Sequence, residues 1–120
     1  MIRERALKAV LVVAGLLFLA GIYPLMIFFR SEAALAMMLS LYVTLGIFLL
    51  TAARNPSANR SLIAFTAWSS FAHAAVMAMQ ALRNVIPRGE LLGVAALFVI
   101  GVALIVLAPA KRERAAAVGA

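Results

Sequence analysis

Four long apolar runs, separated by short polar segments, make up most of the 120-residue chain. The runs cover residues 6–29, 33–53, 61–82 and 91–108. Each is close to the roughly 20 apolar residues that a helix needs to cross a bilayer, and a chain in lipid must satisfy its backbone polar groups internally, as a helix does. The pattern predicts an all-α fold: an integral membrane four-helix bundle with up-down-up-down topology, in a single transmembrane domain over residues 1–120.

The polar segments contain the residues typical of turns. Residues 30–32 form a minimal turn, residues 54–60 contain an Asn-Pro pair, and residues 83–89 combine asparagine, proline and glycine. Inside the first run, Pro24 cannot donate a backbone hydrogen bond. We therefore expect the first helix to bend near Pro24 and to place Tyr23 at the membrane interface.

Composition matters mainly for what it excludes. The chain is 67% hydrophobic, where a soluble domain is about half apolar, so the lipid bilayer is the expected partner. It has one histidine and neither cysteine nor aspartate, too few groups for a three- or four-ligand metal site or a nucleophile–base–acid arrangement. We expect no metal, no cofactor, no catalytic residue and no enzymatic activity.

The net charge of +7 indicates topology rather than nucleic-acid binding, because the basic residues lie between the apolar runs and form no single patch. Eight lie in the N-terminal segment, the second connection and the C-terminal segment: Arg3, Arg5, Lys8, Arg54, Arg60, Lys111, Arg112 and Arg114. The first and third connections contain three: Arg30, Arg83 and Arg88. The positive-inside rule then predicts that both termini are cytoplasmic (N-in/C-in). Glu32 and Glu90 begin the second and fourth helices, where the helix dipole favours a carboxylate.

Polar side chains at membrane depth are confined to the second and third runs. At about 100° per residue, one arc of the third run holds Thr66, Ser69, Ser70, His73, Met77, Gln80 and Asn84. One side of the second run carries Ser40, Thr44 and Thr51. With a rise of about 1.5 Å per residue, these groups lie at similar depths. We therefore expect the two helices to face each other, with His73 near Ser40 and Thr44, and Thr51 near Thr66 or Ser70.

Two interpretations of this polar stripe stay open. In the first, the hydroxyls bond to their own backbone and neutral His73 is a packing residue, because interhelical hydrogen bonds average only about 0.6 kcal/mol. In the second, an ionisable group inside the membrane marks a ligand or proton path. The candidates for such a path are His73, Ser40, Thr44, Thr66, Ser69, Ser70, Gln80 and Asn84. Tyr23, Glu32 and Arg83 are candidates for a small polar cleft at the outer ends of the first three helices.

Two adjacent segments carry a family resemblance: residues 55–62, NPSANRSL, and residues 65–73, FTAWSSFAH. With the short connections, they resemble a bacterial family of small four-helix membrane proteins of unknown function. The resemblance covers nearly the whole chain and implies a location in the bacterial inner membrane. It implies no activity.

Two functions follow from these patterns. The first is a non-enzymatic accessory or scaffolding protein, acting as a homo-oligomer or as a subunit of a larger membrane complex, since no chemistry can be assembled. The alternative is a small transporter, channel or lipophile-binding protein that uses the polar stripe around His73. A fully hydrogen-bonded His73 favours the first function, and a continuous polar path through the bundle favours transport.

Overall fold

The computed structural model describes residues 2–109, and this part of the chain is helical, without strands. Four helical segments are long and apolar enough to cross a membrane, which confirms the predicted all-α class with four membrane-length helices. The elements are α1 (Ile2–Leu19), α2 (Ile22–Ile27), α3 (Ala33–Ala52), η1 (Pro56–Asn59), α4 (Arg60–Leu82), η2 (Arg88–Glu90) and α5 (Leu91–Leu107), where η marks a short 3₁₀ helix. Lys111, Arg112 and Arg114 of the charge count lie outside the described residues.

The first span consists of two helices, α1 and α2, separated by Ala20 and Gly21. Pro24 has no N–H to offer the carbonyl of Ala20, four residues earlier, and its ring crowds that carbonyl. The Tyr23 N–H donates to the Ala20 oxygen instead (3.1 Å), and the Gly21 N–H donates to the Phe18 oxygen (3.0 Å). The interruption expected near Pro24 therefore falls one turn before it.

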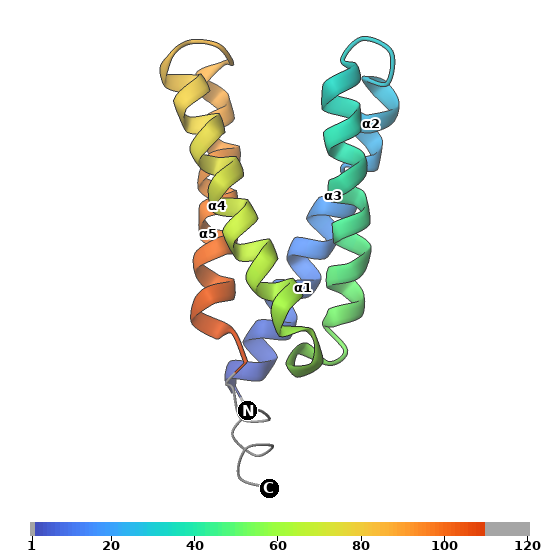
Figure 1. Cartoon of the computed structure of the whole chain (residues 1–120), viewed down its shortest axis with the longest axis vertical. Helices are drawn as coiled ribbons and strands as arrows, with labels where there is room; N and C mark the ends of the chain where they lie inside the picture. Colours follow the sequence, from blue (N-terminus) through green and yellow to red (C-terminus); the bar gives the residue numbers. More distant parts are fainter. Residues whose placement is uncertain (1, 110–120) are drawn as a thin grey trace, which may run out of the picture.

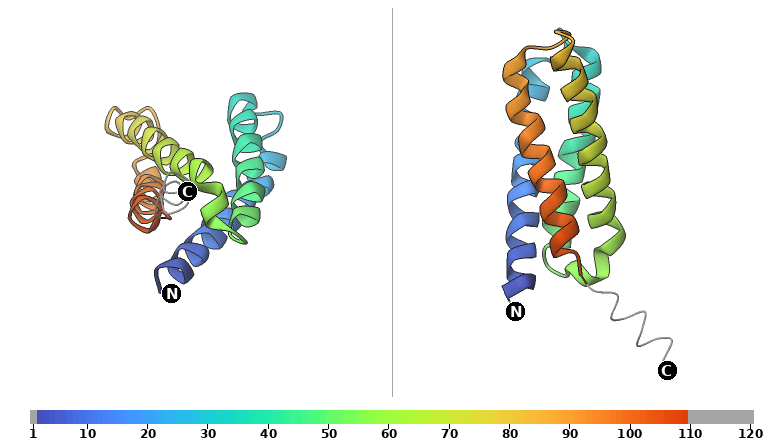
Figure 2. Two further views of the ribbon diagram at one scale, coloured as in Figure 1. Left: turned by 60° about the horizontal axis from the view of Figure 1, so that its bottom comes forward. Right: turned by 90° about the vertical axis from the view of Figure 1, so that its left-hand side faces the viewer.

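The helices form two groups that diverge toward one end of the molecule (Figure 1). α3 lies along α1 and α2, and α5 lies along α4. The backbones of α3 and α4 approach each other only near η1, so the second and third spans, which were expected to face each other, do so across a gap and do not pack along their length. The connections 28–32 and 83–90 lie at the open end, whereas the start of α1, η1 and the end of α5 lie at the closed end (Figures 1 and 2).

Glycine contacts explain which helices pair. α1 and α3 cross with their backbones in contact, since a Cβ atom on Gly46 would lie 2.6 Å from the Gly15 carbonyl oxygen. Between α4 and α5, the Phe71 ring fills the space beside Gly101, where a Cβ atom would lie 2.5 Å from the ring. Small residues allow such close approach in membranes. α4 contains no glycine and the single glycine of α3 faces α1, so α3 and α4 have no comparable contact.

The hydrophobic core fills the closed end of the molecule. Its most deeply buried large side chains come from all four spans: Leu7, Leu11, Leu49, Ile63 and Leu104. Apolar packing therefore joins the two helical groups at this end and leaves them free to diverge at the other.

Two arginines donate hydrogen bonds to carbonyls at the end of α5 and directly after it, at the closed end. Arg3 Nη2 donates to the Ala108 oxygen (2.8 Å) and the Val106 oxygen (3.3 Å), and Arg60 Nε donates to the Pro109 oxygen (3.1 Å). The final carbonyls of a helix have no partner within the helix. These bonds therefore connect the start of α1 and the start of α4 to the end of α5.

Candidate functional site

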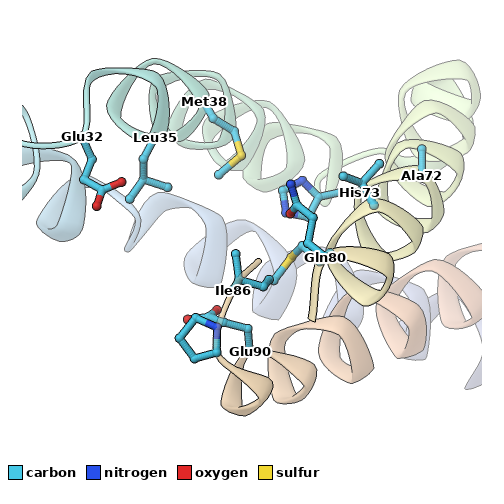
Figure 3. Close-up of a pocket in the computed structure, with 11 residues that line it drawn as sticks. Glu32, Leu35, Met38, Ala72, His73, Gln80, Ile86 and Glu90 are labelled. Carbon is cyan, nitrogen blue, oxygen red and sulfur yellow. The ribbon is translucent and has the colours of Figure 1, made fainter. Parts of the chain in front are cut away.

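A cavity of about 720 Å³ lies between α3 and α4 at the open end (Figure 3). Ligand pockets in proteins typically have volumes of about 300–1,000 Å³, so this cavity has room for a small organic molecule. We call it the α3–α4 cleft. It is lined by Glu32, Leu35, Met38, Ala72, His73, Val76, Met77, Gln80, Ile86, Pro87 and Glu90.

The two walls of the cleft are regular helix faces. On α4, His73, Met77 and Gln80 follow one another at spacings of four and three residues, which places them on one side of a helix. On α3, Leu35 and Met38 are three residues apart and share a face in the same way. Most of the lining is apolar, so the few polar groups stand out as the ones able to orient a ligand.

An aromatic contact joins the two walls. The His73 ring packs edge-on against Tyr42 of α3, with centroids 5.3 Å apart and planes at 77°. Tyr42 packs in the same manner against Phe18 of α1 (5.0 Å, 83°). Sequence reasoning did not include Tyr42, although its spacing of four from Met38 and seven from Leu35 places it on the cleft-facing side of α3.

Ser40 and Thr44, the expected neighbours of His73, lie at the predicted depth in α3, but their side chains are not on the face of α3 that contacts His73. Tyr42 lies midway between Ser40 and Thr44, and residues two apart on a helix do not share a face. Both hydroxyls are exposed and donate to their own helix: Ser40 Oγ to the Met37 oxygen (2.6 Å) and Thr44 Oγ1 to the Ser40 oxygen (3.0 Å). Neither residue lines the cleft.

In α4, the hydroxyl groups of Thr66 and Ser69 also donate to carbonyl oxygens of their own helix. Thr66 Oγ1 donates to the Leu62 oxygen (2.8 Å), and Ser69 Oγ donates to the Thr66 oxygen (3.2 Å). The Ser70 hydroxyl is buried and has no hydrogen-bond partner among residues 2–109. Thr51, expected near Thr66 or Ser70, is exposed and donates to the Ile47 oxygen of its own helix (3.1 Å).

The candidates at the open end divide into two groups. Glu32 and Gln80 line the cleft, whereas Tyr23, Arg83 and Asn84 are exposed and do not.

Asn84 ends α4. It has a positive φ of 60°, the Val85 N–H donates to the Gln80 oxygen (2.8 Å), and the Asn84 N–H donates to the Ala81 oxygen (3.2 Å). This is the Schellman pattern that terminates helices, so Asn84 has a structural role here.

Two carboxylates stand on opposite sides of the cleft (Figure 3). Glu32 directly precedes α3, and Glu90 ends η2 before α5. Sequence reasoning assigned Glu90 only to the helix dipole, because nothing in the pattern indicates that the 83–90 connection lies over the α4 face. In the described part of the chain the only ion pair is Lys8 with Glu4 (3.9 Å), so neither cleft carboxylate has a basic partner there.

The chemistry available in the cleft is that of binding. No group of three or more histidine, cysteine, aspartate or glutamate side chains able to hold a metal ion occurs within residues 2–109. His73, Gln80, Glu32 and Glu90 provide hydrogen-bonding and charged groups around an apolar volume. An elongated molecule with an apolar body and a polar end matches this distribution.

Comparison with known proteins supports the family resemblance. No curated protein and no solved structure matches the chain. The family model described as "Family of unknown function (DUF6632)" matches residues 3–118, nearly the whole sequence. The chain therefore belongs to DUF6632, a family of unknown function.

Proposed function

We propose that this protein is a multi-pass protein of the bacterial inner membrane that binds a lipophilic ligand in the α3–α4 cleft. The observation that carries the proposal is the cleft itself, a cavity of ligand size whose apolar walls contain His73 and Gln80. Ionisable groups inside membrane-spanning helices are costly and mark functional positions more often than other residues do.

The orientation we propose has both termini in the cytoplasm. Basic residues favour this arrangement by eight to three, counted over the terminal segments and connections. The start of α1, η1 and the end of α5 lie together at the closed end of the molecule (Figure 1). In this orientation the closed end is cytoplasmic, and the cleft opens on the outer side of the membrane.

Binding fits the cleft better than conduction does. The closed end is filled by apolar side chains such as Leu11, Leu49 and Ile63. Channels and transporters select and pass their substrate with polar or charged groups that line the path, and the polar groups of the cleft stop near His73. One histidine with no cysteine or aspartate also argues for a non-enzymatic role.

A bulky residue in the cleft tests the proposal. Ala72 and Ala75, three residues apart on the same helix, are both exposed, but only Ala72 lines the cleft. We expect Ala72→Phe to reduce saturable binding of the neutral lipophile Nile red in nanodiscs severalfold. Ala75→Phe adds the same ring elsewhere and is expected to bind like the unmodified protein. Equal binding by both variants, with helix content unchanged by circular dichroism, would contradict a site in the cleft.

A second candidate function is that of an accessory or scaffolding subunit or a homo-oligomer. Ser40, Thr44 and Thr51 lie exposed on α3, and hydroxyl residues are enriched where membrane helices associate. Gentle extraction from native membranes, followed by mass spectrometry of the intact complex, tests this role. A strict monomer without a stoichiometric partner would remove its support.

A further inference from the structure

The charged groups at the mouth of the α3–α4 cleft are both acidic. Glu32 and Glu90 line the cavity from opposite sides, and no lysine or arginine is among its lining residues. The three arginines of the adjoining connections, Arg30, Arg83 and Arg88, are exposed, as the two carboxylates are, but none of the three lines the cleft. The basic residues at the open end therefore do not neutralise the two carboxylates inside the cleft.

We infer that the ligand is an amphiphilic cation, an apolar chain that carries an ammonium group; this inference rests on the proposed function. The ammonium group would lie between Glu32 and Glu90, because two like charges facing one cleft repel each other and a cation between them is attracted by both. The chain would lie against Met38, Val76 and Met77. Methionine side chains are flexible and polarisable, and they adapt to apolar ligands of varied shape.

The polar groups deeper in the cleft suit the same class of ligand. Gln80 and the neutral form of His73 offer hydrogen bonds without adding a fixed positive charge. An anionic headgroup would instead face two carboxylates and no basic side chain of the lining. A neutral lipophile would fill the apolar volume but leave the carboxylates without a partner.

Three probes that share a twelve-carbon chain test the inference: dodecyltrimethylammonium, dodecyl glucoside and dodecanoate. Binding is measured by native mass spectrometry of the full-length protein released from maltoside micelles. We expect the ammonium probe to form a one-to-one complex with an affinity about tenfold above the other two, from two exposed ion pairs of about threefold each.

Charge-neutralising variants locate the effect. Glu32→Gln and Glu90→Gln are each expected to weaken the ammonium probe about threefold, and the double variant about tenfold, to the level of the glucoside. Glu4→Gln is the matched control, since Glu4 lies in α1 and is paired with Lys8 away from the cleft. Competition by phosphatidylethanolamine would identify a membrane lipid as the source of the ammonium group. Competition by the single-chain probe alone would identify a free amphiphile, and both results support the inference.

The outcomes separate the inference from the proposed function. If all three probes bind equally and Ala72→Phe weakens each of them, a lipophile site exists and the preference for a cation is wrong. If Glu4→Gln weakens the ammonium probe as much as the double variant does, the effect is one of net charge and the inference fails. If no probe binds and Nile red does not bind either, both proposals fail.

Discussion

Five hydroxyl groups of α3 and α4 donate to carbonyl oxygens of their own helix, three or four residues back. Such bonds satisfy serine and threonine inside a membrane without any ligand, so the first interpretation of the polar stripe describes these residues well. His73 differs from them. Its ring contacts Tyr42, it lines the cleft, and no hydrogen bond of its side chain is found within residues 2–109.

The Tyr42 ring is expected to hold α3 to α4 through its edge-on contact with His73, and to hold α3 to α1 through its contact with Phe18. Tyr42→Ala removes both contacts and is expected to lower the free energy of unfolding by about 2 kcal/mol. Tyr42→Phe keeps the ring and is expected to change it by less than about 0.5 kcal/mol. Unfolding in mixed micelles with increasing sodium dodecyl sulfate measures both variants. Equal losses would mean that the hydroxyl group, rather than the ring, makes the important contact.

Asn84 is expected to matter for ending α4 and not for binding. Because its φ is 60°, Asn84→Gly should leave the melting temperature unchanged, whereas Asn84→Val should cost about 1–2 kcal/mol. Nile red binding by the folded Asn84→Gly variant should match that of the unmodified protein. Weaker binding by this variant would mean that Asn84 takes part in ligand binding.

At the scale of helices, hydropathy predicts the membrane-length segments because each must match the bilayer thickness. Pro24 likewise predicts an interruption of the first helix, since it cannot supply a backbone donor. Helix pairing was not predictable in this way. Sequence spacing gives the depth of Ser40 and Thr44 in the membrane. Which face of α3 lies toward α4, however, depends on the backbone contact between Gly15 and Gly46.

That backbone contact leads to a prediction for α1 and α3. A methyl group on Gly46 would meet the Gly15 carbonyl oxygen at 2.6 Å and the Leu19 nitrogen at 2.7 Å, and neither backbone atom can move aside alone. Gly46→Ala is therefore expected to destabilise the protein by about 1–3 kcal/mol. Gly93→Ala is the control, because its nearest neighbour is the flexible Met77 Cε at 3.5 Å. Thermal unfolding followed by circular dichroism compares them, and equal melting temperatures would contradict the crossing.

At the scale of the whole molecule, the cleft results from unequal packing. The core and the arginine bonds to α5 join all four spans at the closed end, while glycine contacts hold α3 to α1 and bring α5 close to α4. The sequence indicated the polar face of α4 around His73. It contained no signal for a gap beside that face, or for Glu90 reaching it from the following connection, because both depend on how the two helical groups diverge.

Photolabelling with a neutral diazirine-bearing lipophile, followed by peptide mapping, tests binding in the cleft most directly. In the reconstituted full-length protein we expect label on residues 35–38 of α3 and 72–80 of α4, suppressed by an excess of unlabelled probe. Label confined to outward-facing side chains such as Phe65 and Trp68, which are 62% and 64% exposed, and unaffected by the excess, would contradict the proposed site.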